Sequence, residues 1–251
     1  MCLSIGLKAK KTEVIQMKEI KFTIHTLSNL LIGGNESGFI IGGIDQHTVR
    51  DHNGYPYIPG SSFKGVFRKI VRDDNHEDIS KIFKDYKDEL INKAKEASKN
   101  LDLKVEVLKF TKELEKGIES DSEYMFGSNG YNQSPQLLFS DIHLTKESIA
   151  AGNHFSIDAK NLVEEKDGEL TAKPRTYKVA RRGLTFTGTI RFRNFDKLDD
   201  KDKATVENYI KCQLDKVFDG GFYRLGNSKS RGYGHVEVKV IEIDGAKVGD
   251  S

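Results

Sequence analysis

The sequence has few of the features that mark several large classes of protein. Only two of its 251 residues are cysteine, Cys2 and Cys212, which provide neither a disulfide framework nor the spacing of a zinc site. No apolar run approaches the roughly 18 residues that a membrane-spanning helix needs. The N-terminal stretch MCLSIGLKAKKTEVIQMKEI is too polar for a secretory signal. These absences favour a cytoplasmic globular protein with no membrane partner.

The common catalytic motifs are also missing. No glycine-rich run leads into the Lys-Ser/Thr pair of a Walker loop, which disfavours a nucleoside triphosphatase. The seven histidines are scattered singly, and no nucleophile stands beside an obvious base. A metabolic enzyme with a small-molecule pocket therefore finds no support in the sequence.

Charge is abundant but nearly balanced, with 40 basic and 38 acidic residues and a formal net charge of +2. Composition alone therefore does not argue for a nucleic-acid partner. The charges are nevertheless unevenly distributed, which predicts a basic face, with solvated charges on ordinary helices as the competing interpretation. Acidic residues gather at 73–123 and 196–215, and basic residues gather at 64–72, 173–182, 191–193 and 224–231.

Hydrophobic periodicity predicts a mixed α+β fold. Apolar and polar residues alternate as in strands at 18–27, 136–144 and 184–195, and a last strand follows a glycine-rich basic loop near the C-terminus. Helical spacing follows Pro59, where Ser61 or Ser62 is the predicted N-cap, and recurs at 200–218.

Two segments interrupt this pattern. Residues 77–120 are charged and helix-favouring, which predicts an inserted pair of surface helices. Residues 155–182 predict a β-hairpin that turns at Asp167 and Gly168. Without the insertions the order is β-α-β-β-α-β, the ferredoxin-like (RRM-like) arrangement. We expect one such domain over 17–243, between an extension at 1–16 and a tail at 244–251.

The segment PYIPGSSFKG is the first candidate binding motif. The start of a helix presents free N–H groups and the positive end of the helix dipole, so it receives phosphate well. Hydroxyls and cations from the same turns would add to this site: Ser61, Ser62, Lys64 and Arg68. Serine capping with two exposed basic residues is the alternative interpretation.

Asp45 is the second candidate. It follows apolar and glycine residues in IIGGIDQHTVRD, which predicts a carboxylate in largely apolar surroundings. Such a carboxylate could orient or deprotonate a ribose 2′-hydroxyl, or bind a divalent metal. An aspartate that stabilises a turn is the alternative.

The third candidate is the loop RLGNSKSRGYGHV. Glycines let a backbone close on a phosphate chain, cations neutralise it, and Tyr223 and Tyr233 could stack on bases. A solvated flexible loop is the alternative. The candidate RNA-binding residues of this loop are Gly226, Asn227, Lys229, Ser230 and Arg231, and Gly232 and Gly234 are its further glycines.

Three segments taken together resemble the RAMP superfamily, and within it the backbone subunit of type III CRISPR–Cas effector complexes. They are GGIDQHTVRDHNGYPYIPGSSFKGVFRKI, MFGSNGYNQSPQLLFSDIHL and LGNSKSRGYGHVEV. The resemblance covers 17–243 in order. The helical stretch 77–120 is longer than in the compact type III-A subunit, and the chain is somewhat closer to type III-D subunits.

The resemblance implies a ferredoxin-like palm with a thumb-like hairpin at 155–182. It implies copies of the chain stacked in a filament along a crRNA, beside other type III subunits, with target RNA cut at regular intervals. Asp45 matches the loop aspartate needed for metal-dependent cleavage, so the implied cofactor is Mg²⁺ or Mn²⁺ with Asp45 as its candidate ligand. The helix start and the glycine-rich loop match segments that line the RNA channel.

Two other functions fit the same sequence. A filament subunit could bind RNA without cutting it. A crRNA-processing endoribonuclease of the same superfamily is the other, although no convincing acid–base pair is present for it.

Overall fold

The structure is a computed structural model of the chain. It describes residues 18–33, 44–99, 104–116, 119–127, 134–166, 169–216, 218 and 220–248. The predicted extension at 1–16 lies outside the described residues, as do Asp167 and Gly168. In the described part, no helix is both long and apolar enough to cross a membrane.

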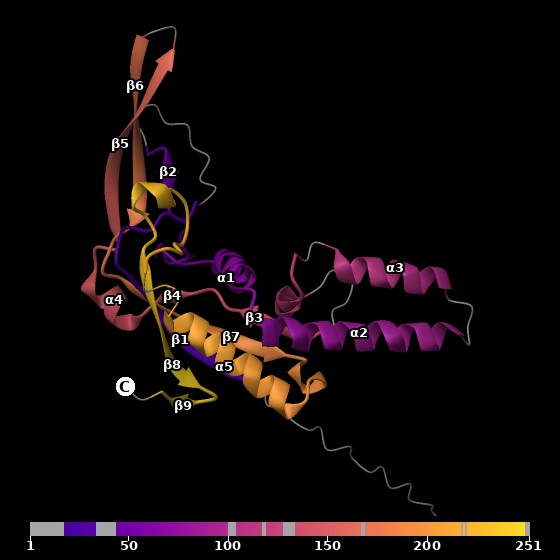
Figure 1. The fold of residues 1–251 in the computed structure, drawn as a ribbon. Helices are drawn as coiled ribbons and strands as arrows, with labels where there is room; N and C mark the ends of the chain where they lie inside the picture. Colours follow the sequence, from indigo (N-terminus) through magenta and orange to yellow (C-terminus); the bar gives the residue numbers. More distant parts are fainter. Residues whose placement is uncertain are drawn as a thin grey trace, which may run out of the picture.

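A six-stranded antiparallel sheet forms the centre of the molecule (Figure 1). Its strand order is β3-β7-β1-β8-β9, with β4 also paired to β7. The mixed α+β class predicted from the sequence is therefore confirmed. The strands are β1 (Glu19–Thr26), β3 (Gln136–Phe139), β4 (His143–Leu144), β7 (Thr185–Arg193), β8 (Val236–Ile243) and β9 (Ala246–Lys247).

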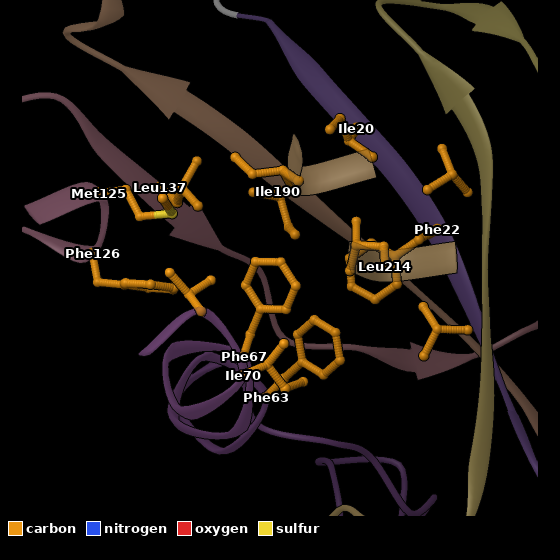
Figure 2. Close-up of a cluster of buried hydrophobic side chains, with 14 of the residues drawn as sticks. Ile20, Phe22, Phe63, Phe67, Ile70, Met125, Phe126, Leu137, Ile190 and Leu214 are labelled. Carbon is orange, nitrogen blue, oxygen red and sulfur yellow. The ribbon is translucent and has the colours of Figure 1, made fainter. Parts of the chain in front are cut away.

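One face of this sheet is buried beneath two helices, α1 (Gly60–Asp74) and α5 (Asp200–Lys216). Strands β1 and β7 alternate buried and partly exposed residues, as the period of two requires when a single face is covered. Apolar side chains from both helices and the sheet meet in one cluster (Figure 2). Its labelled members include Phe22, Phe63, Phe67, Ile190 and Leu214.

A helical extension reaches away from the sheet beyond α1 (Figure 1). It contains α2 (Glu77–Lys99), α3 (Lys104–Glu115) and the 3₁₀ helix η1 (Asp121–Phe126). Helix α2 buries one apolar stripe and leaves charged residues on its other faces, which is the pattern of a surface helix.

A long hairpin projects from the sheet in a different direction from the helical extension, upward in Figure 1. It consists of β5 (Phe155–Lys166) and β6 (Glu169–Ala180), and its register pairs Lys166 with Glu169. The short strand β2 (Gln46–His47) runs parallel to β6 near the base of the hairpin. The short helix α4 (Lys146–Ala151), which the sequence did not predict, precedes β5.

Two local predictions hold only in part, and Asp141 takes part in both differences. The strand predicted at 136–144 is broken between β3 and β4, and Asp141 lies in the break. The Asp141 carboxylate accepts a hydrogen bond of 2.8 Å from the Gly60 N–H at the start of α1. The helix begins at Gly60, so Ser61 and Ser62 lie in its first turn and neither of them caps it.

Candidate functional site

A surface groove of about 520 Å³ lies between α1 and the glycine-rich loop that precedes β8. The groove unites the two predicted binding segments, since Ser61 and Ser62 line one wall and Gly226, Asn227 and Lys229 line the other. Its remaining lining residues are Ile32, Gly33, Gly65, Val66, Lys69, Phe222, Tyr223 and Arg224.

The groove is cationic. None of its lining residues is Asp or Glu, whereas Lys69, Arg224 and Lys229 contribute positive charge. Burial lowers the pKa of Lys229, and the nearby charge of Lys69 lowers it further. Neither lysine forms an ion pair within the described chain. Two adjacent ammonium groups without an acidic partner form a site suited to an anion.

Two glycines of the loop, Gly226 and Gly234, allow close contact with neighbouring backbone. Gly226 has a φ of +75°, and an added Cβ there would lie 2.2 Å from the Leu31 carbonyl oxygen. Gly234 has a φ of +77°, and its Cβ would lie 1.9 Å from the Leu225 carbonyl oxygen. The backbone N–H of Asn227 also donates to Leu31 O at 2.6 Å. The loop is thus fixed against the strand-like segment at 30–33, which forms one edge of the groove.

Ser230 and Arg231 lie in the 3₁₀ turn η3 (Lys229–Arg231), where both are exposed and neither lines the groove. Tyr233 is only 3% exposed, so the prediction that it stacks on a base was wrong. Its hydroxyl donates to Asp158 at 2.7 Å, and the Lys160 ammonium lies 4.0 Å from its ring centre. Tyr233 therefore joins the loop to the base of the hairpin, beside which the gold loop lies in Figure 1.

Lys64 and Arg68 point away from the groove, toward η1. The Lys64 ammonium donates to the Phe126 carbonyl oxygen at 2.9 Å, and Arg68 forms an ion pair with the buried Glu123. Burial lowers the pKa of Lys64, and Arg68 lowers it further. The structure thus brings Ser61 and Ser62 to the groove but separates them from the two basic residues predicted to act with them.

The start of α1 already holds a carboxylate. The Asp141 carboxylate accepts a hydrogen bond from the Gly60 N–H. The Pro59 carbonyl oxygen accepts hydrogen bonds from the N–H groups of Ser62 and Phe63. Among the first-turn N–H groups, only that of Ser61 has no partner in the described chain. The cationic centre of the groove therefore depends on Lys69 and Lys229 more than on the helix terminus.

Asp45 lies outside the groove, at the edge of the hairpin. It is exposed, so the apolar surroundings expected from the sequence are not found. Its carboxylate Oδ2 accepts the Thr176 N–H at 2.5 Å, and its own N–H donates to Thr176 O at 2.8 Å. Thr48, further along the same segment, pairs with Gly33 at the groove edge. Asp45 and the groove are therefore connected through one short stretch of backbone.

The described residues around Asp45 do not form a protein-only metal site. No group of three or more His, Cys, Asp or Glu side chains in the described part of the chain could hold an ion. One of the two Asp45 oxygens is also engaged by the hairpin backbone. The described residues alone therefore do not fit a bound divalent cation.

The sequence did not single out three residues of the groove: Lys69, Phe222 and Arg224. The spacing from Ser62 through Val66 to Lys69 is that of one helix face, a signal that would have placed Lys69 beside the serines. Phe222 is an aromatic residue at the entry to a glycine-rich basic loop, and it is 82% exposed.

The chain was compared with known protein families, and the matching family model spans the residues described above. The family model described as the RAMP superfamily matches residues 23–237, which include both walls of the groove, Asp45 and the hairpin. The chain belongs to the RAMP superfamily.

The proteins similar to this chain include a named relative and a chain of a solved structure. The chain is 26% identical over 231 residues to the protein named CRISPR system Cms endoribonuclease Csm3 of Streptococcus thermophilus, with 89% of each chain covered. It also resembles a chain in the structure of the type III-B Cmr-beta complex bound to cognate target RNA. That match has a TM-score of 0.52 and 17% identity, covers 90% of this chain and 60% of the other, and concerns the fold alone.

Proposed function

We propose that this chain is a backbone subunit of a type III CRISPR–Cas ribonucleoprotein that binds crRNA and cleaves complementary target RNA. The observation that carries the proposal is the acid-free cationic groove between α1 and the glycine-rich loop in a RAMP chain. Such a groove holds a sugar-phosphate backbone without reading bases, so specificity comes from pairing between guide and target. The likeness to a relative named as an endoribonuclease supports the cleavage part.

The architecture supports the same proposal. The order β3-β7-β1-β8, with α1 and α5 on one face, is the order expected of a ferredoxin-like palm. The projecting β5–β6 hairpin would serve as the thumb. Copies of the chain would stack along the guide in the cytoplasm, beside other type III subunits, so that each copy presents one Asp45 to the target.

Asp45 is the proposed cleavage residue. Its Oδ2 is fixed by the Thr176 N–H, and no described residue bonds its Oδ1, which leaves that oxygen for the target. Oδ1 would orient or deprotonate a ribose 2′-hydroxyl, whose oxygen then attacks the adjacent phosphorus in line. The P–O5′ bond breaks and the leaving 5′-oxygen takes a proton from water, so the products carry a 2′,3′-cyclic phosphate and a 5′-hydroxyl.

Replacing Asp45 tests this role. Asp45→Asn keeps an acceptor for the Thr176 N–H but removes the base, so target cleavage in the assembled complex should be abolished while bound crRNA is unchanged. Cleavage is measured on labelled target RNA, with and without chelator and with Mg²⁺ or Mn²⁺ restored. Cutting that survives in Asp45→Asn and Asp45→Ala would show that another residue does the chemistry.

A subunit that binds RNA without cutting it is the second candidate. The structural role of Asp45 at the hairpin edge and the absence of an acidic or histidine cluster among described residues favour it. A target that stays intact in the complete wild-type complex with either metal would establish this alternative.

A further inference from the structure

Phe222 is the most exposed of the large apolar side chains in the described chain, at 82%, and it lines the cationic groove. A ring exposed to this extent offers apolar surface to a ligand, because covering that surface on binding would be favourable. Its neighbour Tyr223 meets it edge-on, with ring centres 5.0 Å apart.

The backbone around Phe222 holds the ring at the groove. Gly221 has a φ of +65°, and its carbonyl accepts the Arg224 Nε–H at 3.1 Å. The Tyr223 hydroxyl donates to Asp73 at 2.9 Å, which ties this segment to the end of α1. Burial, then the bond to Asp73, raises the pKa of Tyr223 to about 12, so the hydroxyl remains a donor at neutral pH. The turn that carries Phe222 is therefore held in place by hydrogen bonds on either side of the ring.

We propose that the Phe222 ring is a platform on which one base of the bound RNA stacks, while the adjoining phosphate lies against Lys69 and Lys229. This inference rests on the proposed RNA-binding function and adds an aromatic contact to it. A cationic groove combined with an exposed ring is the arrangement by which proteins hold single-stranded nucleic acid without sequence preference.

The chemistry of the groove favours RNA over a protein segment as the occupant of this site. The lining contains serine hydroxyls and three cations but no acidic side chain, which suits a phosphate and disfavours a basic or purely apolar peptide. Its volume of about 520 Å³ is in the range of sites that accept a ligand of nucleotide size.

The test uses the full chain, fluorescein-labelled single-stranded RNA and fluorescence anisotropy. Phe222→Leu keeps an apolar side chain but removes the ring, and it should weaken binding about 5- to 100-fold. Phe222→Trp should bind as tightly as the wild type or tighter. An RNA of the same backbone that lacks bases along its length should bind wild type and Phe222→Leu equally. The salt dependence should not change, because no charge is altered.

The outcomes separate this inference from the function on which it rests. Wild-type protein that binds RNA with no loss in Phe222→Leu overturns the stacking platform and leaves the proposed function intact. Equal losses on intact and base-free RNA also overturn it, since Phe222 would then act through the fold or a protein contact. A wild-type chain that binds no RNA overturns both. Leu108→Ala on α3, which removes another exposed apolar side chain, is the matched control and should change nothing.

Discussion

At the scale of single residues, Lys64 and Lys69 lie on the same helix and their ammonium groups meet different surroundings. Lys64 donates to the Phe126 carbonyl inside the protein, whereas Lys69 lines the groove beside Lys229. An ammonium group that already donates to the protein is poorly placed to bind a phosphate. An ammonium group without a protein partner can neutralise a phosphate and release a counterion from the RNA. Lys69 should therefore carry the affinity.

Lys69→Ala should weaken RNA binding and lower the slope of log K against log salt concentration by about 0.7, the value of one phosphate contact on a single strand. The measurement is a set of binding curves for the full chain at several salt concentrations. Lys84→Ala removes the same charge from α2, outside the groove lining, and serves as the control. A slope that is the same in Lys69→Ala and wild type would contradict the assignment.

At the scale of elements, the hairpin and the glycine-rich loop are joined through Asp158. Its carboxylate accepts hydrogen bonds from Tyr233 in the loop and from Asn29 and Ser156. Burial raises the pKa of Asp158, but these hydrogen bonds and Lys160 lower it by more, so the pKa lies below its ordinary value. The ionised form is therefore the one that stabilises the joint.

Because the folded-state pKa of Asp158 is depressed, its contribution to stability is complete above its unfolded pKa of about 4 and is lost as the pH falls through the folded value. Asp158→Asn should lower the free energy of unfolding by about 1 kcal/mol at pH 7, since solvent screens this partly exposed group. The deficit should shrink in acid. Urea unfolding at pH 7 and pH 3 measures it, with the exposed Asp196→Asn as control. A deficit independent of pH would mean that the charge is not involved.

At the scale of the whole molecule, an almost neutral chain presents a cationic groove and a long projecting hairpin. If copies assemble along a guide as proposed, we expect the assembly to depend on the RNA. Protein purified from a host that expresses its CRISPR array should elute as a large particle with a high ratio of absorbance at 260 to 280 nm. Ribonuclease treatment should reduce its mass. A nucleic-acid-free monomer or dimer would contradict the filament part of the proposal.

Much of the fold was predictable from the sequence because it depends on local periodicity. The alternation in β1 and β7, the helical spacing in α1 and α5 and the length of the hairpin strands all follow from patterns within one segment. The break between β3 and β4 was not predictable in this way. In the break, the Asp141 carboxylate accepts a hydrogen bond from the start of a helix that lies far from it in sequence, a contact that no local pattern encodes.

The candidate site likewise has features that follow from local sequence and features that depend on long-range contacts. The sequence by itself determined that a serine-rich helix start, a glycine-rich basic loop and a loop aspartate would be present, since each is a contiguous motif. Only the tertiary structure decided that Lys69 rather than Lys64 and Arg68 faces the groove, that Tyr233 is buried against Asp158, and that Phe222 is exposed. The physical reason is that the charge or ring of a side chain becomes available to a ligand only if no distant part of the chain already satisfies it.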